Sequence, residues 1–228
     1  MGGPRVSRKR TLCRVFVAGV LLIAGCAGAK QITEADRLHA QAQYERGVSL
    51  LRDGQLASAM PALHRAIAID PKVATYHNGL GVLYLELRRP DLALEPLKRA
   101  TDVDASYAEA HLNTGIALAE ASRWGEAIVA YRKAIALPTL INPHIAQQNL
   151  GLALYHVKRY AEAEEALRFA IGLDPQLEAA FYNLGLVLIA VDRQAEAKLA
   201  FRRARELAPN SPFGQAAMER LRELGEGG

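Results

Sequence analysis

Six histidines are the side chains of this 228-residue sequence that could most readily bind a metal ion or transfer a proton. They are His39, His64, His77, His111, His144 and His156. Only His77 and His111 occupy equivalent positions in a pattern that repeats along the chain. On two stacked helices they would lie roughly 10 Å apart, which is too far for both to bind one zinc ion. The sequence therefore predicts no metal site.

Two other patterns could suggest catalysis or nucleotide binding, and each has a structural explanation. Gly79-Leu80-Gly81 is a fragment of a dinucleotide-binding loop, yet it lies in a helical pattern and follows no predicted strand. The acidic cluster of Glu162, Glu164 and Glu165 is typical of a solvated helix face. The sequence contains no nucleophile elbow, phosphate-binding loop or His-Glu-x-x-His motif. We therefore expect neither an enzyme nor a protein that binds a cofactor, metal or small-molecule substrate.

The formal net charge of +4 comes from the N-terminal segment. Residues 1–25 contain five cations and no acid, and the rest of the chain holds 23 basic and 24 acidic residues. The cations are Arg5, Arg8, Lys9, Arg10 and Arg14. They precede ten residues without a polar side chain, 15–24, a run too short to span a bilayer but typical of a secretory signal peptide. Because the basic character belongs to this leader, nucleic acid is not an expected partner.

The leader ends in Ile23-Ala24-Gly25-Cys26, which resembles the lipobox of bacterial lipoproteins. The resemblance implies cleavage after Gly25, a diacylglycerol thioether on Cys26 and an acyl chain on the new amino terminus. Residue 27 is Ala and not Asp. By resemblance to the enterobacterial sorting rule, this implies a lipid-anchored location on the periplasmic face of the outer membrane. The remaining alternatives are an ordinary signal peptide with an incidental cysteine, or a buried N-terminal helix.

Lipidation would leave a mature chain with a single cysteine and a short tether. Cys13 lies within the predicted signal peptide, so no intramolecular disulfide is expected. Residues 26–32 would form the acylated tether. At no more than about 3.6 Å per residue, it would hold the folded part within roughly 20 Å of the bilayer.

The elements that follow are best seen in residues 149–175. Apolar residues recur there at helical spacing on both sides of a break at 157–159, which predicts two amphipathic helices packed as a hairpin. Gly151, Ala163 and Ala170 are expected where the two backbones come closest. One such hairpin cannot bury both of its apolar faces, so it needs neighbouring copies.

The copies are visible as three residue registers that repeat five times. One register consists of glycines and two consist of alanines, and all three keep the same intervals, of which only the third is longer than the others. The residues are Gly47, Gly81, Gly115, Gly151 and Gly185, then Ala59, Ala93, Ala127, Ala163 and Ala197, then Ala66, Ala100, Ala134, Ala170 and Ala204. Pro71, Pro175 and Pro209 close three of the units. The pattern resembles the tetratricopeptide repeat.

This resemblance implies an all-α, right-handed α-solenoid spanning residues 33–224. Its five repeats would be 40–73, 74–107, 108–143, 144–177 and 178–211, followed by a cap helix at 212–224. Thr33-Glu34-Ala35-Asp36 fits a capping box at the start of the first helix. Pro61 and Pro96 fall inside second helices, where each removes a backbone hydrogen bond and could bend the helix.

Family resemblance also implies a concave groove lined by repeat positions 2, 5, 9, 12 and 13 of the first helices. We call the candidate residues at these positions the inner stripe: Val48, Leu51, Asn78, Val82, Leu85, Ile116, Gln148, Leu152, Tyr155, Tyr182, Leu186 and Ile189. The stripe is apolar and lacks cations, so the expected ligand is an apolar strand or amphipathic helix of another protein. Asn78 and Gln148 would be available to its backbone. Alternatively, part of the stripe is ordinary core between helices.

Residues 136–144 carry a proline-bracketed insertion ahead of Asn149-Leu150-Gly151, which accounts for the longer interval between the third and fourth glycines. With Asn113-Thr114-Gly115, this resembles the PilW/PilF and Tgl lipoproteins of type IV pilus systems, although an aromatic near Leu140 is missing. The resemblance implies a pilotin that promotes the localisation and assembly of the pilus secretin. The alternatives are a lipoprotein adaptor for periplasmic enzymes such as peptidoglycan hydrolases, or a regulatory subunit of an enzyme complex.

Overall fold

The computed structural model describes residues 1–3 and 31–226 of the chain. The chain divides into two units, Met1–Gln31 and Ile32–Gly228, and every described helix belongs to the second. Cys13, Cys26 and most of the predicted signal peptide and tether lie outside the described residues.

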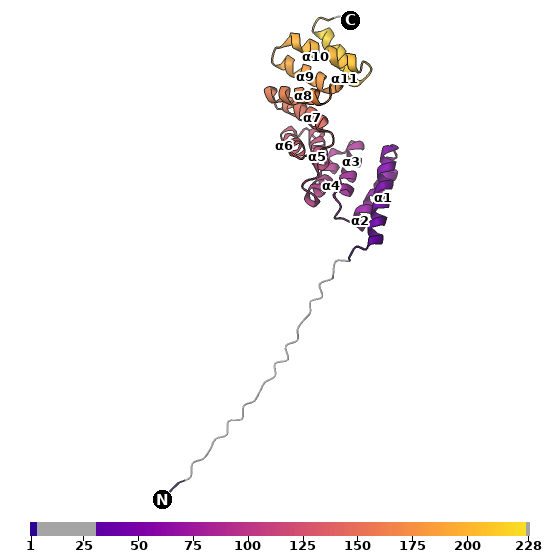
Figure 1. Ribbon diagram of the computed structural model, residues 1–228, viewed down its shortest axis with the longest axis vertical. Coiled ribbons are helices and arrows are strands. Elements are labelled where there is room, and N and C mark those ends of the chain that lie inside the picture. The colour runs from indigo at the N-terminus through magenta and orange to yellow at the C-terminus, as the bar shows by residue number, and fades with distance from the viewer. Residues whose placement is uncertain (4–30, 227–228) are drawn as a thin grey trace. The chain divides into compact units, whose positions relative to one another are not determined.

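The second unit is all-α, as predicted, and its described residues form eleven helices and no strand (Figure 1). The helices are α1 (Glu34–Arg52), α2 (Leu56–Ile69), α3 (Ala74–Glu86), α4 (Pro90–Val103), α5 (Ala108–Glu120), α6 (Trp124–Ile135), α7 (Pro143–His156), α8 (Tyr160–Leu173), α9 (Glu178–Ala190), α10 (Gln194–Leu207) and α11 (Pro212–Glu223). Each pair from α1–α2 to α9–α10 packs as a hairpin, and α11 packs against α9 and α10. The first helices of repeats two to five begin at or next to the predicted repeat starts.

Close contact between the two helices of each pair depends on the repeated glycines. Each glycine faces a large side chain of the second helix, and an added Cβ would lie only 2.4–2.8 Å from it. The pairs are Gly47–Leu63, Gly81–Leu97, Gly115–Tyr131, Gly151–Leu167 and Gly185–Phe201. The repeated alanines have no exposed surface. The registers read from the sequence are therefore the contact surfaces of the hairpins.

The turns within the hairpins share one geometry. The residue after each helix cap has positive φ, at Gly54, Arg88, Ser122, Lys158 and Asp192. In the third repeat, the Ser122 amide donates to the Ala119 carbonyl at 2.9 Å and the Arg123 amide donates to the Leu118 carbonyl at 2.8 Å. These two bonds form a Schellman motif, which satisfies the last carbonyls of the first helix and reverses the chain within a short turn.

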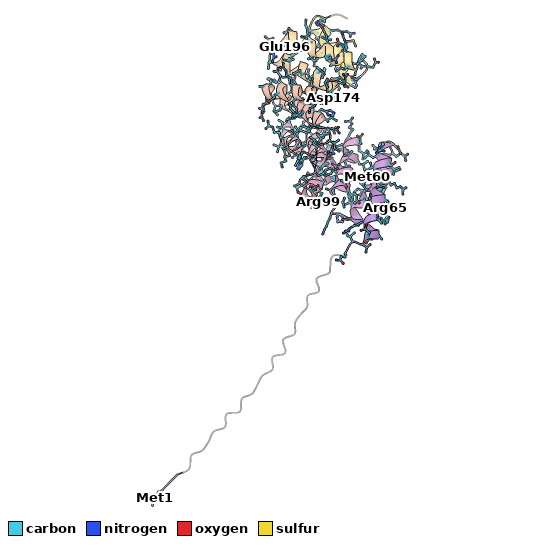
Figure 2. All side chains as sticks on the ribbon, in the orientation of Figure 1. Met1, Met60, Arg65, Arg99, Asp174 and Glu196 are labelled. Carbon is cyan, nitrogen blue, oxygen red and sulfur yellow. The ribbon has the colours of Figure 1, made fainter. Side chains whose placement is uncertain are left out.

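Stacking of the hairpins is asymmetric. Each first helix packs closely on the first helix of the next repeat, from α1–α3 through α7–α9, and α9 packs on α11. Within the described part of the chain, no second helix lies that close to another second helix. The first helices therefore lie on the tighter, inner side of the stack, and the second helices are spread apart on the outer side. Long charged side chains project from the second helices, including Arg65 of α2, Arg99 of α4 and Glu196 of α10 (Figure 2).

The largest continuous part of the hydrophobic core lies in the C-terminal repeats. One cluster of buried residues extends from Leu112 in α5 to Leu221 in α11. Three smaller clusters serve the first two repeats and their junction with the third, centred on Leu63, Leu97 and Tyr76.

Two local predictions have clear outcomes. The capping box is confirmed, because Thr33 Oγ1 accepts from the Asp36 amide at 3.1 Å and the Asp36 carboxylate accepts from the Thr33 amide at 3.0 Å. Pro61 and Pro96 lie inside helices that continue past them as unbroken elements.

Candidate protein-binding surface

The inner stripe consists mainly of partly buried residues, and two of its members are buried in the core. Nine of its residues are partly buried, and Ile189 is 37% exposed. Asn78 and Leu85 are buried, at 8% and 9% exposure. Leu85 packs with Ala93 and Ala117, which places it between repeats. The interpretation that part of the stripe is core therefore holds for these two residues.

The expectation that Asn78 is available to a ligand needs correction. Its Nδ2 donates to the Tyr107 hydroxyl at 3.3 Å, and its Oδ1 accepts from Asn113 Nδ2 at 2.9 Å. Tyr107 is the last residue of the second repeat, and Asn113 belongs to the third. Through these two hydrogen bonds, Asn78 joins the second repeat to the third. Burial, the largest cause, raises the pKa of Tyr107 to about 12, which keeps its hydroxyl protonated and neutral at any physiological pH. Gln148, also expected to serve a ligand, donates from Nε2 to Asn149 Oδ1 at 3.2 Å.

Three stripe residues converge on a cavity of about 150 Å³, which we call the inner pocket. Tyr155 comes from α7, and Leu186 and Ile189 come from α9. The remaining stripe residues do not line this pocket. Its position follows from the stacking, because the C-terminal turns of α7, α9 and α11 lie side by side. The pocket can hold one apolar side chain against an apolar wall.

The cap helix supplies a polar rim that the sequence pattern did not predict. Arg220, Glu223 and Leu224 line the inner pocket, and Arg220 Nη1 donates to Glu223 Oε2 at 2.9 Å. A hydrogen bond with Tyr182, the largest cause, raises the pKa of Arg220 above its ordinary value, followed by the bond with Glu223. The expectation that the groove has no cation is therefore wrong at its C-terminal end, where Arg220 of α11 lines the inner pocket.

A signal for these residues was present in the sequence. The cap helix begins at Pro212, one full repeat after the start of α9 at Glu178. If the repeat register is extended by one unit, Arg220, Glu223 and Leu224 fall at positions 9, 12 and 13, which are groove positions. The sequence pattern is less clear in this unit, because Glu219 occupies the position that is glycine in the five preceding repeats.

The outer side has two equivalent cavities because the second helices are spread apart. We call them the outer gaps: one lies between α4 and α6 with α5 as its floor, and the other lies one repeat later, between α6 and α8 over α7. Their volumes are about 300 and 310 Å³. Phe169, at the edge of the second gap, is 56% exposed.

Ion pairs cross the outer side of the C-terminal repeats. Arg132 of α6 reaches Glu162 of α8 at 2.7 Å, and Arg193, before α10, reaches Glu164 of α8 at 2.8 Å. Hydrogen bonds from Arg159 and then from Arg132 hold the pKa of Glu162 below its usual range. Two of the acids predicted to form a solvated face therefore connect successive repeats.

The insertion after α6 is fixed to the preceding repeat. Thr139 Oγ1 donates to the Ser106 carbonyl at 3.3 Å, and the Ile141 amide donates to Glu109 Oε1 at 3.1 Å. Leu140 packs on the large core cluster, whereas Ile141 is 76% exposed. The insertion thus presents the large apolar side chain of Ile141 to solvent beside the start of α7.

The side chains and motif considered above for metal or nucleotide binding take part in the repeat structure of the described residues. His77 and His111 make the same bond, from Nε2 to a backbone oxygen six residues earlier, with the Pro71 oxygen at 2.8 Å and the Ala105 oxygen at 3.0 Å. Gly79-Leu80-Gly81 lies within α3. No group of three or more His, Cys, Asp or Glu side chains among the described residues could hold a metal ion. In the same residues, no helix has both the length and the apolar character needed to cross a membrane.

A model of the tetratricopeptide repeat family matches residues 29–74, 75–139 and 149–212. The chain belongs to the tetratricopeptide repeat family. With its stacked helix pairs and its solvent-accessible inner pocket, this family member is a protein–protein interaction scaffold.

Solved structures of other repeat proteins have the same fold. PilW, described as a widely conserved type IV pilus biogenesis factor, is 21% identical with a TM-score of 0.68, and the match covers 81% of this chain and 92% of PilW. Pseudomonas aeruginosa PilF is 22% identical with a TM-score of 0.68, covering 86% of this chain and 96% of PilF. MamA is 28% identical with a TM-score of 0.64, covering 72% of this chain and 94% of MamA.

Proposed function

We propose that the protein is a pilotin: an outer-membrane lipoprotein whose inner side binds the type IV pilus secretin and promotes its localisation and assembly. The observation that carries the proposal is the inner pocket, a cavity with an apolar wall on the side where first helices are stacked. The lipobox at residues 23–26 and the fold shared with PilW and PilF support it.

The mechanism needs an anchor and a binding surface. Several acyl chains on Cys26, at about 0.8 kcal/mol per buried methylene, would hold the protein on its membrane far more firmly than one chain. A secretin protomer bound to the inner side would then be confined near that membrane before its own membrane region is inserted. Tethering raises the effective concentration of bound protomers, which favours assembly of the multimer.

The proposal is tested by two changes that separate the anchor from the surface. Cys26→Ser should lower the amount of SDS-resistant secretin multimer and abolish pilus-dependent motility. Ile189→Asp, which places a charge at the inner pocket, should prevent co-purification of the secretin without releasing the protein from its membrane. Leu199→Asp is the matched control, because Leu199 is 61% exposed on α10 and does not line the pocket.

Normal secretin multimers in a strain that lacks the protein would overturn the proposal. Co-purification of peptidoglycan hydrolases in place of the secretin, lost in the Ile189→Asp variant alone, would assign the same surface to an adaptor for envelope enzymes.

A further inference from the structure

The inner pocket has electrostatic features that its apolar wall does not explain. Three parallel helices end beside it: α7 at His156, α9 at Ala190 and α11 at Glu223. A helix C-terminus carries a partial negative charge equivalent to roughly half an elementary charge. The turns after these helices already hydrogen-bond several of the last carbonyls, so the backbone contributes a modest preference for a positive group at the pocket.

At the rim, the carboxylate of Glu223 remains accessible to a partner. Glu223 is the more exposed member of its ion pair, with a side-chain exposure of 63% against 47% for Arg220. Arg220 is hydrogen-bonded to both Tyr182 and Glu223, so it is held in place at the rim, and the Arg220–Glu223 pair carries no net formal charge. A carboxylate has about four lone-pair sites, and Glu223 is hydrogen-bonded to Arg220 through one oxygen, so it can accept another cation.

One carboxylate can serve two arginines elsewhere in this protein. Glu162 accepts from Arg132 at 2.7 Å and from Arg159 at 2.6 Å. Glu164 likewise pairs with Arg168 and Arg193. A lysine or arginine of a bound partner could therefore pair with Glu223 while Arg220 stays in place.

The size of the cavity limits what can occupy it. About 150 Å³ is below the roughly 300 Å³ at which small-molecule sites begin, so the apolar wall fits one inserted side chain. The apolar wall includes Tyr155, Leu186 and Ile189, together with Ala190 and Phe201, and the charged rim lies at its α11 edge.

We propose that the inner pocket recognises a partner segment in which an apolar side chain is flanked closely in sequence by lysine or arginine. The apolar side chain fills the cavity, and the neighbouring cation pairs with Glu223 near the C-terminal ends of α7, α9 and α11. This inference rests on the proposed binding function of the inner side, and it gives that side a sequence preference.

The test is a random peptide library displayed on phage and selected against the full-length protein purified in detergent. The wild type should enrich an apolar residue with a nearby lysine or arginine. Glu223→Gln should keep the apolar preference and lose the basic one, and Glu223→Lys should replace it with an acidic preference. Glu219→Gln is the matched control on the same helix, since Glu219 does not line the pocket. Ile189→Asp should lose the apolar preference.

A synthetic peptide from the enriched set gives the magnitude. Replacing its basic residue with glutamine should weaken binding about two- to fivefold at low salt, and the difference should shrink as salt is raised. Equal enrichment by wild type and Glu223→Gln, an acidic preference in the wild type, or no apolar–basic enrichment would each overturn the inference. None of these results depends on the secretin or on the anchor, so they are separate from a failure of the proposed function.

Discussion

Gly115 shows how one residue sets the distance between two helices. A Cβ at this position would lie 2.4 Å from the Cε1 atom of Tyr131, which is itself 2% exposed and belongs to the continuous core. Neither side can move easily: the glycine is on a helix backbone, and the tyrosine ring is enclosed. The residue therefore acts through steric exclusion, because a larger side chain would push α5 away from α6.

Gly115→Ala should destabilise the protein by about 1–3 kcal/mol through overpacking. Gly125→Ala is the control, because nothing lies within 4 Å of a Cβ at that helical position. It should stabilise by about 0.4–1 kcal/mol, since alanine restricts the unfolded chain. Urea unfolding of both variants measures the difference, and equal effects would show that the close approach does not determine stability.

A second residue-scale prediction concerns His156 and Trp124, whose rings are stacked with centroids 3.8 Å apart. Burial lowers the pKa of His156 below its ordinary value of 6.5. The unfolded chain therefore takes up this proton more readily than the folded one. The stabilising contribution of the neutral ring is complete above pH 6.5 and is lost as the pH falls below that value.

His156→Gln should remove this part of the pH dependence of the melting temperature below pH 6.5. Trp124 is the sole tryptophan of the chain, so its fluorescence reports the stacked pair directly. A fluorescence titration of the wild type with a midpoint at or above 6.5 would contradict the direction of the shift.

At the scale of an element, the turns within the hairpins share one backbone geometry but have different residue types at the position with positive φ. The left-handed conformation costs an L-residue roughly 1–2 kcal/mol, and only the first repeat has a glycine there. The Schellman hydrogen bonds are present in the repeats without glycine as well. The packing of each hairpin therefore imposes the turn, whatever residue stands at that position.

Ser122→Gly should raise the free energy of unfolding by about 0.5–1 kcal/mol, because relief of the strained φ exceeds the added entropy of the unfolded chain. Gly54→Ala should have the opposite sign and cost about 1 kcal/mol. Ser122 is exposed, so its side chain contributes little packing to the comparison. Thermal melts of both variants test it, and a destabilised Ser122→Gly protein would show that the serine has a role beyond its backbone.

The elements differ in how far the sequence could predict them. Pairing of α7 with α8 follows from residues in one stretch, because Gly151 and Leu167 occupy fixed positions of two amphipathic helices. The role of Asn78 could not be predicted in this way. Its partners Tyr107 and Asn113 are distant in sequence, and their approach depends on how repeats stack. Positional rules describe a single repeat. They therefore do not predict which groove side chains are hydrogen-bonded to residues of the neighbouring repeat.

For the whole molecule, the distribution of the core matters more than its total size. The continuous cluster joins the third, fourth and fifth repeats to the cap helix, whereas the first two repeats contain smaller clusters, one of which reaches Ala117 in the third repeat. Helix α1 has only two buried residues, Ala40 and Gly47, along its whole length. In a repeat protein each unit is stabilised mainly by its neighbours, so the two ends of this stack should differ in stability.

Native-state hydrogen exchange should therefore show that α1 and α2 open at a lower free energy than α7 to α10. A matched pair of core truncations tests the cause, because Leu63 and Leu221 are 0% and 1% exposed and belong to different clusters. Each Leu→Ala change removes about 2–5 kcal/mol of local stability. Leu63→Ala should accelerate exchange in α1 to α3 and leave α9 to α11 nearly unchanged, and Leu221→Ala should do the reverse. If either variant accelerated exchange equally along the whole stack, the repeats would form one cooperative unit, and the inner pocket would then be as stable as the N-terminal repeats that lie farthest from it along the chain.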